Sequence, residues 1–205
     1  VIGDPVKHSL SPVIHNAGFR SLGIDWFYVK CEVKEGQAKQ ALEAMKILNL
    51  RGLSVTMPHK TSIAALVDSL SESAQALKSV NTVEVSANGS LIGHSTDGDG
   101  LVASLLEQGV DVAGKDVLIL GAGGAARSVI DALYRRGCHR IFIVNRSLEN
   151  AKLAAELAKG VATAIELSND SAMSEATGQC DIVINATSVG MTKNPDVKSQ
   201  SPISA

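Results

Sequence analysis

Hydrophobic and polar residues alternate along two stretches in the first part of the chain, and a third stretch has a longer period. Residues 25–33 and 52–57 show the two-residue alternation of strands with one buried face. Residues 35–48 instead carry apolar side chains at helical spacing. A serine followed by a proline at positions 11–12 is typical of a helix start, and predicts a helix that stops at Gly23.

The pattern between residues 61 and 94 predicts two short helices and a hairpin. The helices are expected over 61–69 and 72–78, and the hairpin over 82–94 around Asn88-Gly89, a strong signal for a tight turn. With the preceding elements, this gives a β-α-β-α-β order followed by a hairpin. The first part of the chain is therefore expected to be an α/β domain.

Apolar periodicity starts again after Asp97, where a helix is expected to run to Gly109. Strands that alternate with helical segments are then expected over 116–120, 140–145, 161–165 and 181–186. The first of them, DVLIL, is continuously apolar, as in a parallel sheet covered on both faces. We therefore predict an α/β fold of two domains, over 1–96 and 97–205, of which the second is an incomplete Rossmann-like domain.

A glycine-rich turn connects the first strand of the second domain to its helix. The stretch GAGGAA at 121–126 fits the pattern G-x-G-x-x-A. Gly121 permits the tight turn, Gly123 lets the backbone approach a pyrophosphate, and the small Ala126 lets the helix pack closely on the strand. Because the motif follows a strand and opens a helix, its context favours dinucleotide binding over a merely tight turn.

The next predicted strand ends in Asn145, Arg146 and Ser147. Domains that prefer NAD usually carry an acidic residue here, on the ribose hydroxyls, whereas an arginine suits a 2′-phosphate. This ending favours NADP. The alternative is that Ser147 caps a helix and Arg146 is a solvated surface residue.

Composition and charge narrow the classes of function. The 205 residues are 45% hydrophobic, and the net charge of -2 is spread without a basic run, which excludes a nucleic-acid or membrane-surface face. No apolar run approaches the ~20 residues of a membrane span. Three scattered cysteines fit reduced thiols and a cytoplasmic location. The five histidines show no metal-ligand spacing, so no metal site is expected.

The strand over 52–57 ends at Pro58, and Lys60 follows at its carboxyl end, where α/β sheets bind ligands. From the residues alone, Lys60 could be a catalytic or a solvated lysine. Asp97 could likewise be a helix cap, a residue facing a cleft, or both. Ser9 and Ser11 could be anion ligands at a helix N-terminus or local caps.

Several separate stretches together resemble the shikimate dehydrogenase family, in an order and spacing that match along essentially the whole chain. They are GDP at 3–5, HSLSP at 8–12, HN at 15–16, GLSVTMPHK at 52–60, VNT at 80–82, STDG at 95–98, GAGGAA at 121–126, NRS at 145–147 and NATSVGM at 185–191. The resemblance implies two α/β domains that flank a cleft, the first for substrate and the second for NADP. It implies reversible reduction of 3-dehydroshikimate to shikimate, a step of chorismate and aromatic amino-acid biosynthesis.

The resemblance also implies roles for particular residues. By position, Ser9, Ser11 and Thr56 hold the substrate carboxylate. Lys60, Asn81 and Asp97 contact the ring hydroxyls and the reacting oxygen, with Lys60 and Asp97 as the catalytic pair. The expected cofactor residues are Gly121, Ala122, Gly123, Gly124, Ala125, Asn145, Arg146, Ser147, Thr187, Ser188 and Met191.

The chain departs from the family pattern in places. Ser54 and Ser95 stand where the family often has asparagine. Nothing corresponds to the family's C-terminal tyrosine, glutamine and final helix, so the chain is expected to be shortened and weakly active. The alternatives are a quinate/shikimate dehydrogenase with NAD or mixed cofactor use, and a non-catalytic dinucleotide sensor. Lys60 and Asp97 favour an enzyme, expected to be a monomer or a homodimer.

Overall fold

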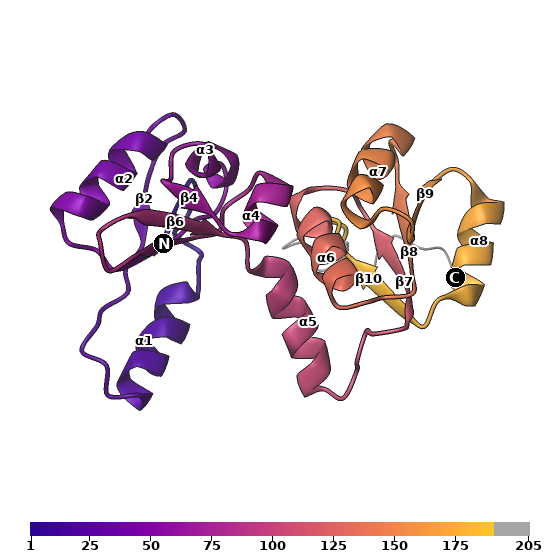
Figure 1. Ribbon diagram of the computed structural model, residues 1–205, viewed down its shortest axis with the longest axis horizontal. Helices are drawn as coiled ribbons and strands as arrows, with labels where there is room; N and C mark the ends of the chain where they lie inside the picture. The colour runs from indigo at the N-terminus through magenta and orange to yellow at the C-terminus, as the bar shows by residue number, and fades with distance from the viewer. Residues whose placement is uncertain (191–205) are drawn as a thin grey trace. The chain divides into compact units, whose positions relative to one another are not determined.

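A computed structural model describes residues 1–190 of the chain, which divides into two compact units between Thr96 and Asp97 (Figure 1). The roles predicted for the two units, substrate binding for the first and cofactor binding for the second, stay predictions. Among the described residues, no helix is both long and apolar enough to cross a membrane.

The first unit is built on a mixed four-stranded sheet, and residues from three of its helices join the core. Its elements are β1 (Ile2–Gly3), α1 (Ser11–Ser21), β2 (Cys31–Glu32), α2 (Ala38–Ile47), β3 (Gly52–Ser54), α3 (Lys60–Ala64), β4 (Ser69–Leu70), α4 (Glu72–Leu77), β5 (Thr82–Val85) and β6 (Leu91–His94). The four-stranded sheet has the order β3-β5-β6-β4, and only the β4–β6 pair is parallel. Met45 of α2 and Ile63 of α3 pack with Val83 of β5 in its core.

The hairpin predicted over 82–94 is confirmed, because β5 and β6 pair antiparallel around Gly89, whose φ is +84°. The strand predicted over 25–33 is wrong in length, since only Cys31–Glu32 forms β2. Its partner β1 offers only Ile2 and Gly3 to the ladder, so the alternating side chains before Cys31 have no neighbouring strand on which to pack.

The helix predicted over 61–69 is also too long. Helix α3 ends at Ala64, and Ser69–Leu70 forms β4 instead. Asp68 starts this strand by donating its N–H to Leu91 O, while its carboxylate accepts the N–H of Leu91 at 2.7 Å. Long-range pairing with β6 therefore outweighs the local helical pattern.

The second unit has a parallel sheet covered on both faces. Its elements are α5 (Asp97–Glu107), β7 (Asp116–Leu120), α6 (Gly124–Arg135), β8 (Arg140–Asn145), α7 (Leu148–Ala155), the 3₁₀ turn η1 (Glu156–Ala158), β9 (Ala162–Glu166), α8 (Asp170–Gln179) and β10 (Ile182–Asn185). The strand order is β10-β7-β8-β9, with every pair parallel. This is the predicted Rossmann-like arrangement.

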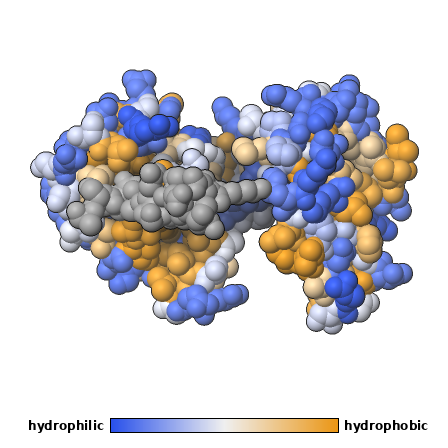
Figure 2. Space-filling model, turned by 180° about the vertical axis from the view of Figure 1, so that it is seen from behind, coloured by the Kyte–Doolittle hydropathy of each residue, from blue (hydrophilic) through white to orange (hydrophobic). Residues whose placement is uncertain are grey.

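The side chains of β7 and β8 point alternately to the two faces of this sheet, and each face has its own hydrophobic core. Ile119 and Ile143 pack toward α6 and α7, while Leu118 and Phe142 pack toward α8. Apolar side chains also reach the surface of the chain, as the orange residues of Figure 2 show. Helix α1 contributes to this surface, because it buries none of its residues.

Candidate active site

The glycine-rich turn has the geometry that its sequence predicts. Gly121 follows β7 with a φ of +105°, and a Cβ there would lie 3.2 Å from both Ala186 O and the methyl of Thr187. A side chain at Gly121 would thus be strained twice, by its backbone conformation and by crowding. Gly121 is held in place by donating its N–H to Val144 O at 2.8 Å.

Helix α6 begins directly at the turn, with Gly123 as its N-cap and Gly124 as its first residue. A Cβ added at Gly123 or Gly124 would meet nothing within 4 Å. The backbone here faces open space, and the first N–H groups of a helix have no partner within it. The turn therefore fits an anionic group such as a pyrophosphate.

A cavity of about 530 Å³ extends from this turn to the end of β8. Its lining consists of Ala122, Gly123, Asn145, Arg146, Ser147 and Asn150. Ser147 Oγ accepts the N–H of Asn150 at 3.3 Å and so caps α7, as the alternative interpretation of this residue required. Arg146 is exposed and makes no hydrogen bond or ion pair with the described residues 1–190. Its guanidinium is thus available to a ligand in the cavity.

The loop after β10 is fixed by Asn185, a residue not among the predicted contacts. Its Oδ1 accepts the N–H of Thr187 at 3.0 Å and the hydroxyl of Thr187 at 2.7 Å, while its Nδ2 donates to Val189 O. Thr187 is thereby held against Gly121, and exposed Ser188 follows it. An asparagine at a strand end, two residues before a threonine, is the signal that would have indicated this turn. Met191 lies outside the described residues.

In the first unit, Ser9 and Ser11 form a pair at the start of α1. Ser9 Oγ donates to Ser11 Oγ at 3.0 Å and accepts the N–H of Ser11 at 3.2 Å. The N-cap position itself is Leu10, which offers no side-chain cap. The two hydroxyls and the first N–H groups of α1 therefore converge at one helix terminus, an arrangement that suits a carboxylate.

Thr56 lies against Gly3, at the end of β1. A Cβ on Gly3 would come within 2.3 Å of the Thr56 methyl, so only glycine leaves room for this contact. The N–H of Thr56 donates to Ile2 O at 3.0 Å, which continues the parallel bridge between Ile2 and Val55. The threonine is thus fixed where β1 and β3 both end.

Backbone hydrogen bonds bring Lys60 and Asn81 to the same region. The N–H of Val55 donates to Asn81 O at 2.7 Å, and the N–H of Val80 donates to Lys60 O at 3.0 Å. The Asn81 side chain is fixed by Thr96, whose N–H donates to Asn81 Oδ1 at 3.0 Å. Three of the predicted substrate residues, Thr56, Lys60 and Asn81, are therefore neighbours within the first unit.

Two further residues hold this region in place, and their roles were not predicted from the sequence. His59, the N-cap of α3, is 1% exposed and its Nε2 lies 2.8 Å from Val33 O. This histidine anchors the segment that carries Lys60, although its position in the sequence indicated no role. Tyr28 donates its hydroxyl to Ser54 Oγ at 2.5 Å, so a long side chain reaches the shorter residue that stands where the family often has asparagine.

Asp97 is the first residue of α5 and therefore belongs to the second unit. It lies in the first turn of that helix, where a carboxylate is favoured by the helix dipole. Its neighbour Gly98 is buried against α6. Asp97 is thus the first residue of α5, and α5 packs closely on α6, the helix that follows the glycine-rich turn.

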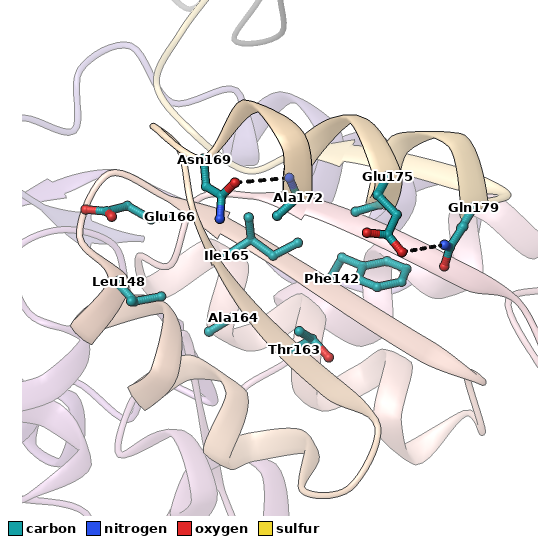
Figure 3. A pocket seen from close by; sticks show the side chains of 11 residues that line it. Phe142, Leu148, Thr163, Ala164, Ile165, Glu166, Asn169, Ala172, Glu175 and Gln179 are labelled. Atoms are coloured by element: carbon teal, nitrogen blue, oxygen red, sulfur yellow. Dashed lines mark hydrogen bonds between the residues drawn. The ribbon is translucent and has the colours of Figure 1, made fainter.

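Another cavity, of about 390 Å³, lies between α8 and the strands β8 and β9 (Figure 3). None of the predicted site residues lines it. Asn169 uses its Oδ1 to cap α8 through the N–H of Ala172, and Glu175 accepts a hydrogen bond from Gln179. Three of the polar side chains that line this cavity are therefore already engaged in capping or stabilising α8.

The groups with strongly shifted pKa values lie at the opposite end of the second sheet. A hydrogen bond from Arg140 lowers the pKa of Asp116 to about 2, with a further contribution from His139. Burial raises the pKa of the Cys138 thiol to about 11. Both residues are near the amino ends of the strands, so these shifts reflect structural contacts. Among residues 1–190, no cluster of histidine, cysteine and acidic side chains is placed to hold a metal ion.

Two family profiles match the chain. The profile described as shikimate dehydrogenase substrate binding domain matches residues 1–83, and the profile described as shikimate / quinate 5-dehydrogenase matches residues 102–198. The matches fall in both compact units and leave residues 84–101, with Asp97, between them.

Curated relatives agree with these profiles. A protein of Rubrobacter xylanophilus named shikimate dehydrogenase (NADP(+)) is 42% identical over 191 residues, which are 93% of this chain and 67% of the relative. A protein of the same name from Caldanaerobacter subterraneus is 41% identical over 207 residues, covering 100% of this chain and 71% of the relative.

Solved structures are similar as well. Shikimate 5-dehydrogenase of Listeria monocytogenes, in complex with shikimate and NAD, superposes with a TM-score of 0.91 at 35% identity, over 98% of this chain and 71% of that one. Shikimate 5-dehydrogenase of Thermus thermophilus, in complex with NADP(H) and shikimate, gives 0.79 at 32% identity, over 92% and 67% of the two chains.

Proposed function

This chain belongs to the shikimate dehydrogenase family, and we propose that it catalyses the NADP-dependent, reversible reduction of 3-dehydroshikimate to shikimate. The observation that carries the proposal is the presence, in one chain, of an open glycine-rich turn with Arg146 beside it and of the Thr56, Lys60 and Asn81 group in the other unit. Curated relatives named for this activity with NADP support the reaction and the cofactor.

The residues of the second unit fit NADP. The N-terminus of α6 at Gly124 offers backbone N–H groups to the pyrophosphate, and Arg146 offers its guanidinium to the 2′-phosphate. Thr187 and Ser188 are assigned to the nicotinamide end, next to Gly121. The bound cofactor donates or accepts the hydride, and the protein supplies position and charge.

The residues of the first unit fit a hydroxylated ring with a carboxylate. Ser9, Ser11 and Thr56 offer hydroxyl groups, and the N-terminus of α1 offers N–H groups to the anion. Asn81, held by Thr96, presents an amide that can both donate to and accept from ring hydroxyls. The domain role proposed for residues 1–96 agrees with the family profile over residues 1–83.

Lys60 and Asp97 are proposed as the catalytic residues. When the ketone is reduced, its oxygen develops negative charge, which an ammonium group stabilises before delivering a proton. Lys60 has that role in our proposal. Asp97 is the second member of the pair, as the resemblance to the family implies, and is proposed to bond a hydroxyl of the substrate.

The alternative functions have less support. Relatives named shikimate dehydrogenase (NADP(+)) do not favour a quinate dehydrogenase with NAD, and a non-catalytic sensor requires neither Lys60 nor Asp97. The proposed substrate is a small molecule. The chain is proposed to act as a monomer or a homodimer. A cytoplasmic location is also proposed, because the three free cysteines favour a reducing compartment.

The proposal is tested by measuring binding and turnover separately. Calorimetry with shikimate and with NADP is expected to show one saturable site for each. Reduction of NADP in the presence of shikimate is expected, with much less reduction when quinate or NAD is substituted. Binding of NADP without any turnover would favour the sensor, and equal rates with quinate and NAD would favour the broader dehydrogenase.

A further inference from the structure

Helices α5 and α6 approach each other closely at Gly98. A Cβ on Gly98 would lie 2.0 Å from Ser128 O and 2.9 Å from the Cβ of Ala132. Neither distance is possible for a real side chain, and the first involves backbone. Any residue other than glycine would therefore separate the two helices, which makes the position of α5 on α6 unusually well determined.

A buried hydrogen bond fixes the helices at this contact. The N–H of Gly98 donates to Ser128 Oγ at 2.8 Å, and Ser128 is 5% exposed. The N–H groups of a first helical turn have no partner within their own helix. Ser128 thus caps the N-terminus of α5 from a different helix. Serine is not favoured in a helix interior, and this capping contact explains why a serine stands at this buried position.

A second link joins the same helices two turns further along α6. Arg135 Nη2 contacts Asp99 Oδ1 at 2.7 Å, and Arg135 Nε contacts Asp131 Oδ2 at 3.0 Å. Asp131 is buried, while Asp99 belongs to the first turn of α5. The start of α5 is therefore held by α6 at two points, one buried and one closer to solvent.

The residue held by this arrangement is Asp97, which immediately precedes Gly98. Helix α6 begins at Gly124, one turn before Ser128, and carries the glycine-rich turn at its N-terminus. We propose that Ser128 is a positioning residue for catalysis, because it holds the first turn of α5, and with it Asp97, in a fixed place on the cofactor-binding helix. This inference rests on the role proposed above for Asp97.

The test separates a positioning role from a contribution to stability alone. Ser128→Ala is expected to lower kcat for shikimate oxidation about tenfold, since small displacements of a catalytic group are costly. The Kd for NADP is expected to stay unchanged, because the glycine-rich turn remains intact. The control is Val129→Ala, which truncates a neighbouring buried side chain of the same helix. It is expected to lower Tm at least as much as Ser128→Ala, with kcat near wild type.

A double variant shows whether the effect passes through Asp97. In an Asp97→Asn background, Ser128→Ala is expected to cause no further loss of kcat. An equal tenfold loss in both backgrounds would overturn the inference, as would a normal kcat for Ser128→Ala in the wild-type background. Normal activity of Asp97→Asn alone would instead contradict the proposed function, so the two failures are distinguishable.

If Ser128→Ala is too unstable to purify, Arg135→Gln provides a second variant. It removes the outer link and leaves the buried contact of Gly98 in place. A drop in kcat of about threefold, with an unchanged Kd for NADP, is expected from the same displacement of Asp97. An unchanged kcat in this variant would contradict the inference.

Discussion

Asn145 and Glu166 are register partners at the ends of β8 and β9, so an amide and a carboxylate stand side by side at the edge of the second sheet. Partners in a parallel pair point to the same face of the sheet. Asn145 lines the proposed cofactor cavity, and Glu166 is one of the residues drawn around the other cavity, beside α8, in Figure 3. Because the two residues are paired, the negative charge of Glu166 lies one strand away from the edge of the cofactor cavity, near the place proposed for the 2′-phosphate.

Glu166→Gln is predicted to strengthen NADP binding. Removing a carboxylate near the 2′-phosphate is expected to lower the Kd for NADP about two- to fivefold at low salt, and to leave the Kd for NAD unchanged. Titration calorimetry with both cofactors measures the effect. Glu107→Gln, at the end of α5, changes the net charge equally and is the matched control. The same gain in Glu107→Gln would mean that overall charge alone is responsible.

Arg146→Ala is predicted to weaken NADP binding about ten- to a hundredfold. A charge-assisted hydrogen bond is worth roughly 1.5–3 kcal/mol, and NAD lacks the phosphate that would receive it. The Kd for NAD is thus expected to change little, and the loss for NADP to shrink at high salt. Equal losses for both cofactors would show that Arg146 has a structural role.

Lys60→Ala is predicted to lower kcat by about 10²–10⁴, the usual contribution of a positioned acid or base. Binding of shikimate is expected to fall much less, because other residues hold the carboxylate. Steady-state kinetics and calorimetry give the two quantities. Lys46→Ala, in the last turn of α2, is the control and is expected to behave as wild type. Near-normal turnover by Lys60→Ala would exclude it as the catalytic residue.

Replacing both Ser9 and Ser11 with alanine is predicted to raise KM for shikimate about tenfold or more, with the Kd for NADP unchanged. Each hydroxyl that bonds a carboxylate is lost, and a hydrogen bond to a charged group is worth roughly 1.5–3 kcal/mol. If Tm falls while KM stays constant, the serine pair serves only the start of α1.

Stability of the second unit is predicted to depend on Asp116 at low pH. Its folded pKa of about 2 lies below the ordinary value of 3.8, so the ionised form is favoured in the folded state. The stabilisation is complete above pH 4 and disappears as the pH falls through the folded pKa. Asp116→Asn is therefore expected to lower Tm at pH 7, with the difference from wild type narrowing between pH 4 and 2. A constant difference over that range would show that the Arg140 pair does not contribute.

The parts of the fold that follow local rules could be predicted from the sequence. Gly121 and Gly89 each stand at a turn that needs a positive φ. The glycine-rich turn with its following helix, and the hairpin, could therefore both be predicted. The strand over 25–33 could not be delimited, because its extent depends on how many residues its partner β1 offers. Strand β4 could not be predicted for a similar reason, because only its pairing with β6 distinguishes it from the end of a helix.

For the candidate site, residues with a recognisable motif were easier to identify than those that hold them. Thr56 and Asn81 come together through backbone hydrogen bonds between elements that are distant in sequence. His59 lies in a quoted stretch but was given no role, and Ser128 lies in none; their contacts with Val33 and Gly98 exist only in the folded chain. Their roles depend on burial and on distances that no spacing rule encodes.

The two units keep their hydrophobic cores separate, and this separation has a consequence for synthesis of the chain. Every described strand of the first unit, from β1 to β6, lies before Thr96, and among the described residues its core takes none from beyond that point. This unit can fold on the ribosome while the later strands of the second sheet are still being translated. The substrate residues that precede Asp97 would then be in place before the second sheet is complete, and heat or denaturant is expected to melt the two units in separate steps.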